Sequence, residues 1–449
     1  MTNPDSTITN KLVLKGKIVL KTPLIIGSGN NDLSDIEVLK DESGRAFIPA
    51  TSFVGVLRHR IEKESNTTQS GYFWGSRTAE GAQSALCCHD LRTKKAVIKI
   101  RDGVVINPKT GIAIDKKKYD YEVVEPGASF DMHLEVTVRK AFAKEEFKKI
   151  LATIVSLLTE EKVPFGAKTT SGFGRCQLKD IEYYEFNFKN RDDVIRWLRQ
   201  DFSQKTNLDT EPFPMIEQKT FTIDAAFSIK NSLIVRSYSS DPNSSDAMHI
   251  DSNGKNVLPG TSIKGTIRAR GLKILKTLGW ADAEDKINNL FGIVDDKDNT
   301  KKKIKSRVTV KETEIRNVEV ELQHRIKIDR FTGGVIKGAL FDSMPLWGKG
   351  NDRAIEIKMT IDHYEAWEAG LLLLTLKDLW NEDLPVGGEK SVGRGILKGV
   401  LAKIRWDGKE VTIEEQDNRL VFSEPDLANI LNAFCKPLQY EEVNNVGTK

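Results

Sequence analysis

The strongest constraint on the fold of this chain is an internal duplication. Three blocks of sequence recur in the same order, at offsets of 210, 222 and 221 residues. The pairs are "IPATSFVGVLRHR" (48–60) with "LPGTSIKGTIRAR" (258–270), "INPKTG" (106–111) with "IDRFTG" (328–333), and "VPFGAKTTSGFGR" (163–175) with "LPVGGEKSVGRG" (384–395). Ordered self-similarity of this kind indicates repeated structural units, so the chain is expected to hold two copies of one fold.

Each copy also repeats one order of expected elements. A segment of alternating apolar and polar residues predicts a strand, and an amphipathic helix follows the P-x-T-S turn. Further strands, a second helix, a glycine-rich loop and a last strand complete the copy. The helices are expected at residues 51–64, 143–162, 261–275 and 362–380. This is the order of a ferredoxin-like split βαβ unit with a long insertion, and it predicts an α+β protein of two tandem ferredoxin-like (RRM-like) domains.

The domain boundaries follow from the repeat and from a polar, proline-containing stretch between the copies. The sequence predicts a first domain at 1–200, a linker at 201–218, a second domain at 219–406 and a C-terminal extension at 407–449.

Composition narrows the class of protein without identifying it. The N-terminus lacks the basic and apolar regions of a signal peptide, and the longest apolar run, "LLLLTL", is too short for a membrane span. Cys87, Cys88 and His89 invite a zinc interpretation but have no second ligand pair nearby, so a reduced, cytoplasmic protein with no membrane partner is expected. A net charge of +4, from 68 basic and 64 acidic residues, does not by itself indicate nucleic acid.

The P-x-T-S turns predict helix starts. Ser or Thr before an apolar-periodic run is an N-cap signal, and the N–H groups of a helix N-terminus can hold a phosphate. Polar and basic side chains near each start are therefore candidate phosphate contacts: Ser52, Arg58, Ser262, Lys264 and Arg268.

The glycine-rich loops are neither Walker loops nor dinucleotide fingerprints, because a helix ends into each loop and a strand leaves it. Glycines there permit left-handed backbone and close approach of an extended ligand. A phosphate backbone held without base recognition is the predicted ligand. Its candidate contacts are Lys168, Thr170, Gly172 and Gly174 in the first loop, and Lys390, Ser391, Gly393 and Arg394 in the second.

Together, I-P-x-[TS]-S-x-x-G-x-x-R, a mid-domain T-G with basic neighbours such as Arg330, and a late G-x5-G-x-G resemble the repeat-associated mysterious protein (RAMP) superfamily. Within it, the copies look most like the backbone subunit of type III CRISPR-Cas effector complexes, and two fused copies resemble a type III-D arrangement. The resemblance implies that the chain holds a guide RNA, that each insertion is a thumb hairpin, and that complementary target RNA is cut beside each thumb. The partners implied are guide RNA, target RNA and other subunits of the complex.

The resemblance also implies one catalytic aspartate per copy, acting with Mg²⁺ or Mn²⁺, in the loop after the first strand. In the first copy it falls on Asp35, with Asp32 as the fallback. A single carboxylate suffices chemically because the RNA supplies its own 2′-hydroxyl as nucleophile. From the pattern alone, a turn aspartate held by backbone N–H groups is the favoured interpretation of Asp35, and only the resemblance favours a catalytic role.

The second copy matches this loop less cleanly. Aligning Asp251 with Asp41 places Ser245 opposite Asp35, and Asp246 falls one residue late. Because a loop tolerates such a slip, Asp246 is the candidate catalytic residue and metal ligand, as Asp35 is in the first copy. Asp241 and Asp251 remain alternatives.

Other functions stay open at this stage. One or both copies could hold RNA without cutting it. The chain could also be a ribonuclease that processes the repeat precursor, for which His59 is the candidate histidine near the first helix. His249 lies in the second candidate loop and could donate a proton to the leaving oxygen, although a surface histidine is the simpler interpretation.

Overall fold

The computed structural model divides the chain into two compact units. The first contains residues 1–103, 119–169 and 173–217, and the second contains residues 104–118, 170–172 and 218–449. The structure describes residues 6–27, 35–64, 70–76, 83–107, 110–216, 218–237, 245–294, 303–350, 352–416 and 419–439. Each unit is described below by itself.

The first unit is built on an antiparallel sheet whose long central strand is β1 (Ile8–Leu20). In order across the sheet, the strands are β2 (Phe47–Ile48), β4 (Leu91–Thr93), β7 (Ser129–Arg139), β1 and β8 (Cys176–Asn187), and β3 (Leu86–Cys88) also pairs with β7. Leu12, Leu14 and Ile18 of β1 are fully buried, whereas Lys17 is exposed. Leu12, Leu14 and Ile18 belong to one core, whereas Val13, on the opposite face of the strand, belongs to another.

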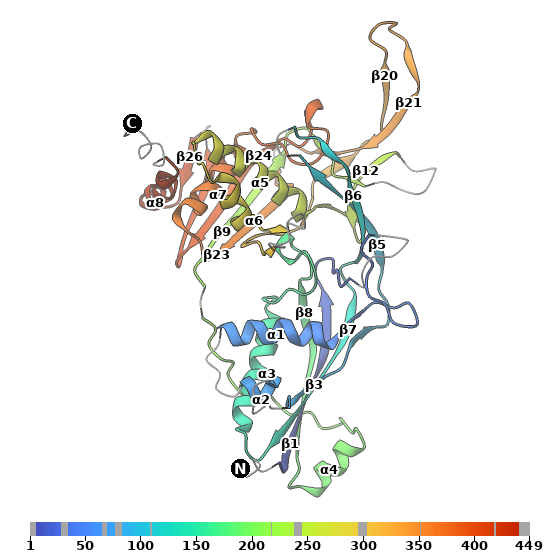
Figure 1. The fold of residues 1–449 in the computed structure, drawn as a ribbon, viewed down its shortest axis with the longest axis vertical. Helices are drawn as coiled ribbons and strands as arrows, with labels where there is room; N and C mark the ends of the chain where they lie inside the picture. Colours follow the sequence, from blue (N-terminus) through green and yellow to red (C-terminus); the bar gives the residue numbers. More distant parts are fainter. Residues whose placement is uncertain are drawn as a thin grey trace. The chain divides into compact units, whose positions relative to one another are not determined.

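Two helices cover one face of this sheet, α1 (Ala50–Glu64) and α3 (Lys144–Thr159) (Figure 1). Phe53, Leu57 and Ile61 lie four residues apart on α1 and are fully buried in one core with the apolar face of α3. Burying each such side chain stabilises the folded state by about 1.5–3 kcal/mol of free energy. The short α2 (Ser70–Trp74) adds to the same core.

The other face of the sheet is covered by α4 (Arg191–Leu198), which the sequence did not predict. Trp197 of α4 packs against the core of Val13, Tyr184 and Phe186. The side chain of Asn190 caps α4 by accepting a hydrogen bond from the N–H of Asp192 at 3.0 Å. The first sheet is therefore buried on both faces over this stretch.

The second unit repeats this plan on a sheet centred on β9 (Thr220–Ile229). In order across the sheet, the strands are β17 (Val308–Val310), β23 (Ile355–Asp362), β9, β24 (Leu397–Trp406), β25 (Lys409–Gln416) and β26 (Arg419–Phe422), all antiparallel. The last two strands belong to the predicted C-terminal extension. That extension therefore continues the second sheet.

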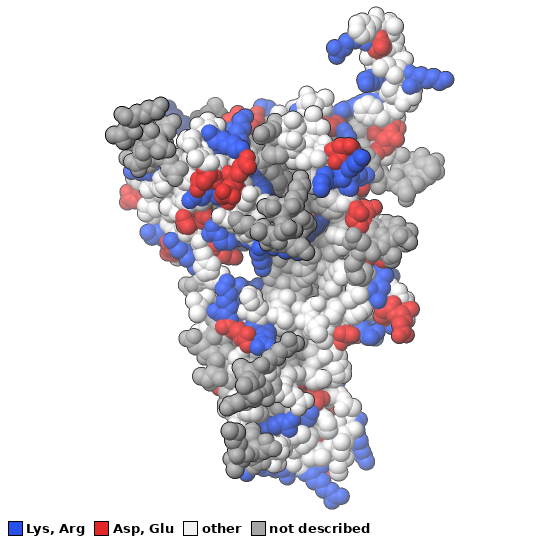
Figure 2. All heavy atoms as spheres, in the orientation of Figure 1, with Lys and Arg blue, Asp and Glu red and all other residues white. Residues whose placement is uncertain are grey.

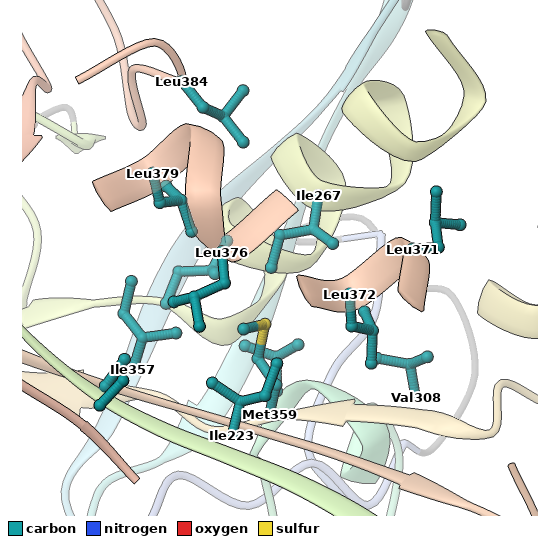
Figure 3. Packing of buried hydrophobic residues seen from close by; sticks show 14 of the residues in the cluster. Ile223, Ile267, Val308, Ile357, Met359, Leu371, Leu372, Leu376, Leu379 and Leu384 are labelled. Atoms are coloured by element: carbon teal, nitrogen blue, oxygen red, sulfur yellow. The ribbon is translucent and has the colours of Figure 1, made fainter. Parts of the chain in front are cut away.

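Helices α5 (Gly260–Thr277), α6 (Ala283–Phe291), α7 (Ala366–Trp380) and α8 (Pro425–Cys435) complete the second unit. Figure 3 shows Ile267 of α5 and Leu376 of α7 packed against Ile223 and Met359 of the sheet, which are members of one buried core. α7 is buried almost all round because α8 packs on it, which explains its run of four leucines. Within the described residues, no helix is both long and apolar enough to cross a membrane.

Each copy contains an inserted hairpin. It lies between α1 and β7 in the first copy, and between α5 and β23 in the second. In the first copy it is formed by β5 (Ile98–Ile106) and β6 (Ala113–Val124), and in the second by β20 (Gln323–Ile328) and β21 (Val335–Met344). β21 also pairs in parallel with β12 (Ala247–His249), which pairs with β11 (Arg236–Ser237).

Small strands complete the described structure of the second unit. They are β10 (Ser232–Leu233), β13 (Asp251–Ser252), β14 (Lys255–Leu258), β15 (Ile293–Val294), β16 (Lys303–Ile304), β18 (Thr313–Glu314), β19 (Val318–Val320) and β22 (Leu346–Gly348). Three short 3-10 turns are also present: η1 (Thr169–Ser171), η2 (Lys390–Val392) and η3 (Lys436–Gln439). The whole is a mixed α+β protein, as the sequence predicted.

The predicted N-cap of α5 is wrong. Pro259 is the N-cap residue, no side chain caps the helix, and Ser262 lies inside the first turn. A Cβ on Gly260 would lie 2.2 Å from the carbonyl oxygen of Ser171 and 2.4 Å from that of Val310, so the first residue of α5 has room only for glycine. At α1, the N–H of Ala50 donates to the Asp90 carboxylate at 2.9 Å, so the acceptor comes from a distant loop.

Candidate catalytic sites and nucleic-acid interface

In the first unit, Asp35 is exposed beside the inserted hairpin and is bound reciprocally to Asp120 of β6. The N–H of Asp35 donates to Asp120 Oδ1 at 3.0 Å, and the N–H of Asp120 donates to Asp35 Oδ2 at 3.1 Å. A parallel bridge joins the next residues, Ile36 and Tyr121. The loop that carries the candidate carboxylate is therefore fixed to the second strand of the hairpin. Asp32 lies outside the described residues.

In the second unit, Asp246 occupies the same position relative to its own hairpin. The N–H of Asp342, on β21, donates to Asp246 Oδ2 at 2.9 Å. The next residues, Ala247 and Ser343, form a parallel pair, as Ile36 and Tyr121 do. Asp246 is thus the structural counterpart of Asp35 and is likewise exposed.

The one-residue slip between the copies lies in a turn downstream of both aspartates. The N–H of Leu39 donates to the carbonyl of Ile26, and that of Ile250 donates to the carbonyl of Val235. These matching bonds leave the turn at residues 40–46 one residue longer than the turn at 251–256. Counting back across unequal turns is what placed Ser245 opposite Asp35.

The alternative aspartates of the second copy do not share this place. Asp251 lies at the start of the turn, where its Oδ2 accepts a hydrogen bond from the N–H of Gly254 at 3.0 Å. That is the bond expected of an aspartate which holds a tight turn. Asp241 lies outside the described residues.

In the second unit, a histidine lies next to Asp342. His324 on β20 is directly opposite Asp342 in the hairpin register, and its Nδ1 lies 2.7 Å from Asp342 Oδ1. At the repeat offset of 222, the first copy has Asp102 in place of His324 and Asp120 in place of Asp342. The two candidate sites therefore share two aspartates and differ at the third position.

His249 is placed unfavourably for the proton transfer considered from sequence. It is 7% exposed, its Nδ1 accepts the N–H of Val235 at 3.2 Å, and its Nε2 lies 2.9 Å from the carbonyl of Val257. Burial lowers the pKa of His249 to about 4, against the opposing effect of the bond to the Val257 carbonyl. The imidazole is therefore a neutral structural link between β12 and its neighbours.

The glycines of the two loops close the same backbone turn. The N–H of Gly174 donates to the carbonyl of Pro23, and the N–H of Gly395 donates to that of Ser232, both at 2.7 Å. Both glycines have positive φ, and a Cβ on either would lie 1.8 Å from a carbonyl oxygen, of Phe165 or Val386. Their first role is structural, and a role in RNA binding stays a prediction.

Lys168 points into the interior of the first loop. Its Nζ lies 3.3 Å from the centroid of the Tyr121 ring and 4.8 Å from that of Tyr119. Burial, together with the nearby charge of Arg101, lowers the pKa of Lys168 to about 7. The ammonium group is therefore poised to lose or gain a proton near neutral pH.

Glu389 takes the place of Lys168 in the second loop, at the repeat offset of 221. Its carboxylate is 5% exposed and pairs with Arg236 at 2.9 Å and with Arg325 and Arg394 at 2.8 Å. Burial opposes ionisation, but the hydrogen bond from Arg236 and the charges of the other two arginines outweigh it and lower the pKa of Glu389. We call these four residues the Glu389 cluster.

The predicted RNA contacts are in part used within the fold. The Arg268 guanidinium donates to the Gly292 carbonyl at 2.9 Å and to Asn288 Oδ1 at 2.7 Å, which ties α5 to α6. Arg394 is 3% exposed within the Glu389 cluster. Lys264 donates to Thr170 Oγ1 at 2.9 Å inside the second unit, so the structure brings these two predicted contacts together.

Other predicted contacts face solvent. Ser52, Lys390 and Ser391 are exposed, and Arg58 forms a surface pair with Glu62 at 3.1 Å. Arg330 is exposed near the tip of the β20–β21 hairpin, where Phe331 is 92% exposed. Figure 2 shows basic side chains on this projecting hairpin. Their contact with RNA stays a prediction.

The sequence analysis missed Asp120, Asp342 and the pairing of His324. A signal for the two aspartates was present, because they recur at 222 residues, the offset of the second repeated block. Their pairing with Asp35 and Asp246 depends on a parallel strand pair between segments 85 and 96 residues apart. That pairing had no local signal.

Comparison with known proteins gives two results. A model of the RAMP superfamily matches residues 17–177 and, separately, residues 227–398. The chain is also similar to the CRISPR system Cms endoribonuclease Csm3 of Methanocaldococcus jannaschii, with 24% identity over 222 residues, 40% of this chain and 86% of that protein. Each superfamily match includes the exposed aspartate and the glycine loop of one copy.

Proposed function

Because the chain belongs to the RAMP superfamily and matches its model twice, we propose that it is a backbone subunit of a type III CRISPR effector complex. In this proposal it is a tandem fusion that binds a guide RNA and cuts complementary target RNA at two sites. Guide RNA, target RNA and the other subunits of the complex are its partners. The similarity to a protein named as a CRISPR endoribonuclease supports the same class.

One observation carries the cleavage proposal. Asp35 and Asp246 are exposed at the base of an inserted hairpin in both units, each held by a backbone N–H of the hairpin's second strand. We interpret each sheet with its helices as a ferredoxin-like core and each hairpin as a thumb. A repeated loop that keeps one carboxylate in one geometry, through a change of turn length, is consistent with a conserved chemical task.

The chemistry needs little from the protein. The 2′-hydroxyl of the target attacks the adjacent phosphorus, Asp35 or Asp246 accepts its proton, and the bond to the 5′ oxygen breaks. Mg²⁺ or Mn²⁺ held by Asp35 or Asp246 would stabilise the negative charge that develops on the phosphate. Asp35 and Asp246 would each offer one carboxylate to a hydrated Mg²⁺, which takes only one or two from a protein, and the described residues contain no group of three or more acidic, histidine or cysteine side chains placed to hold a metal.

Guide binding would use the loops and helix starts of both units. Lys390 at the second glycine loop and Arg330 at the second hairpin are exposed and supply positive charge, whereas Lys168 lies against the tyrosine rings of the first loop. Contacts of this kind position a phosphate backbone without reading its sequence.

A non-cleaving scaffold is the second candidate. The observation that favours it is the reciprocal bond between Asp35 and Asp120, since an aspartate satisfied by a backbone N–H is also what an ordinary turn requires. The same experiment separates the two candidates.

The test assembles the complex with a guide and a labelled complementary RNA in Mg²⁺. Asp35→Asn and Asp246→Asn remove the charge but keep an oxygen to accept the hairpin N–H, so the loops stay folded. Each is expected to lose one cut by about 100-fold or more and to leave the other unchanged. Asp41→Asn and Asp251→Asn, in the neighbouring turns, serve as matched controls that keep both cuts.

If wild type and all variants bind target and none cuts, the chain is a scaffold. If Asp251→Asn rather than Asp246→Asn loses the second cut, the second site is assigned to the wrong aspartate.

A further inference from the structure

Three side chains form a row across one sheet of the second unit. β12, β21 and β20 lie side by side, Asp342 is directly opposite His324, and Asp246 is joined to the N–H of Asp342. Adjacent strands are about 4.8 Å apart, so the backbones of Asp246 and His324 are separated by about 10 Å, with Asp342 between them. Asp246 and His324 therefore lie on either side of Asp342 in the row.

His324 is held with one nitrogen directed away from Asp342. An ionised carboxylate only accepts hydrogen bonds, so the Nδ1 of His324, at 2.7 Å from Asp342 Oδ1, carries a proton. The second nitrogen, Nε2, can then donate outward when the ring is protonated. The His324 side chain is 64% exposed.

The strand that carries His324 is anchored from its other face. Gln323 Oε1 accepts from Arg394 at 2.6 Å, and Arg325 pairs with Glu389 at 2.8 Å. Successive strand residues point to opposite faces, so both neighbours bind the buried Glu389 cluster while His324 faces the row. Because the strand is anchored, the His324 side chain would lose little conformational entropy when substrate binds.

Resting on the proposed function, we propose that His324 is the general acid of the cut at Asp246, with Asp342 as its positioning residue. The 2′ oxygen bonds to phosphorus and gives its proton to Asp246. The bond from phosphorus to the 5′ oxygen breaks, and His324 Nε2 gives that oxygen its proton. The products are a 2′,3′-cyclic phosphate and a 5′-hydroxyl.

The first unit provides an internal control. The repeat offset places Asp102 where the second copy has His324, so the cut at Asp35 proceeds without this histidine. The two cuts of one chain therefore differ in how the leaving oxygen is protonated.

The experiment measures both cuts separately on one labelled target, with the fully assembled complex. His324→Ala and His324→Gln are expected to slow the Asp246-dependent cut about 100-fold and to leave the Asp35-dependent cut unchanged. A target with sulfur in place of the 5′ bridging oxygen at the second position needs no proton on its leaving group. We expect that target to restore the second cut in both variants.

Three results would overturn the assignment of His324: an unchanged second cut, equal slowing of both cuts, or a loss that the sulfur-containing target does not restore. If the wild-type complex makes neither cut, the proposed function itself fails, and the role of His324 fails with it.

Discussion

The two glycine loops have the same backbone and bury opposite charges. Lys168 and Glu389 both adopt positive φ, of 54° and 53°, and both point into the interior behind a hairpin. The lysine lies over tyrosine rings, whereas the glutamate is surrounded by three arginines. The glycines fix the turn, so the buried side chain can reverse its charge as long as its neighbours change with it.

The shared backbone can be tested first, because it has the largest expected effect. Gly174→Ala and Gly395→Ala each place a Cβ 1.8 Å from a carbonyl oxygen at positive φ. We expect each to lower the free energy of unfolding by about 5 kcal/mol, measured by urea denaturation of the full chain. Gly393→Ala, whose Cβ would have no neighbour within 4 Å, is the control and should lose about 1 kcal/mol. If the two substitutions lowered the free energy of unfolding by strongly unequal amounts, the two loop backbones would not be equivalent.

Removing the charge of Glu389 and removing that of Lys168 should change the free energy of unfolding by different amounts. Glu389→Gln leaves Arg394 buried without its charge partner, and we expect a loss of about 3–5 kcal/mol in the free energy of unfolding. Lys168→Met removes a buried cation that has aromatic rings beside it, so we expect no loss at pH 7. Glu410→Gln, in an exposed pair with Arg405, is the control and should change stability by less than about 1 kcal/mol. Equal losses for Glu389→Gln and Lys168→Met would remove the distinction between the loops.

The pH dependence of stability sharpens the comparison further. The pKa of Lys168 is about 7 in the folded unit, below the ordinary value of 10.5. Between these values the unfolded chain holds a proton that the folded unit lacks, so this group makes stability rise with pH. The slope is at most about 1.4 kcal/mol per pH unit. The difference in unfolding free energy between wild type and Lys168→Met should therefore change in favour of wild type from pH 7 to pH 10, and a constant difference would refute the buried, neutral lysine.

The repeat and the periodicity predicted much of this fold. Two copies, their amphipathic helices and the inserted segments followed from spacing alone, because these features are local. Helix α4 was missed because "RDDVIRWL" is only eight residues long and half of them are charged, and its burial depends on packing against β8. The start of α5 was misassigned because the helix begins after Pro259 without a side-chain cap, which the Thr-Ser pattern does not reveal.

The candidate sites were predictable only in part. Asp35 and Asp246 were chosen from a resemblance and a tolerated slip, and the structure locates that slip in a turn. The contacts of Lys168 and Glu389 were not predictable, since both lie in near-identical glycine patterns. What distinguishes them is a set of aromatic or basic residues contributed by distant strands.

The unequal turns at residues 40–46 and 251–256 mark a position where chain length varies between the copies while the geometry of Asp35 and Asp246 is kept. Such a position is suited to carrying added sequence. A fluorescent reporter or an affinity peptide inserted there would sit next to a proposed cut in either half, and the two halves could then be followed independently within one chain.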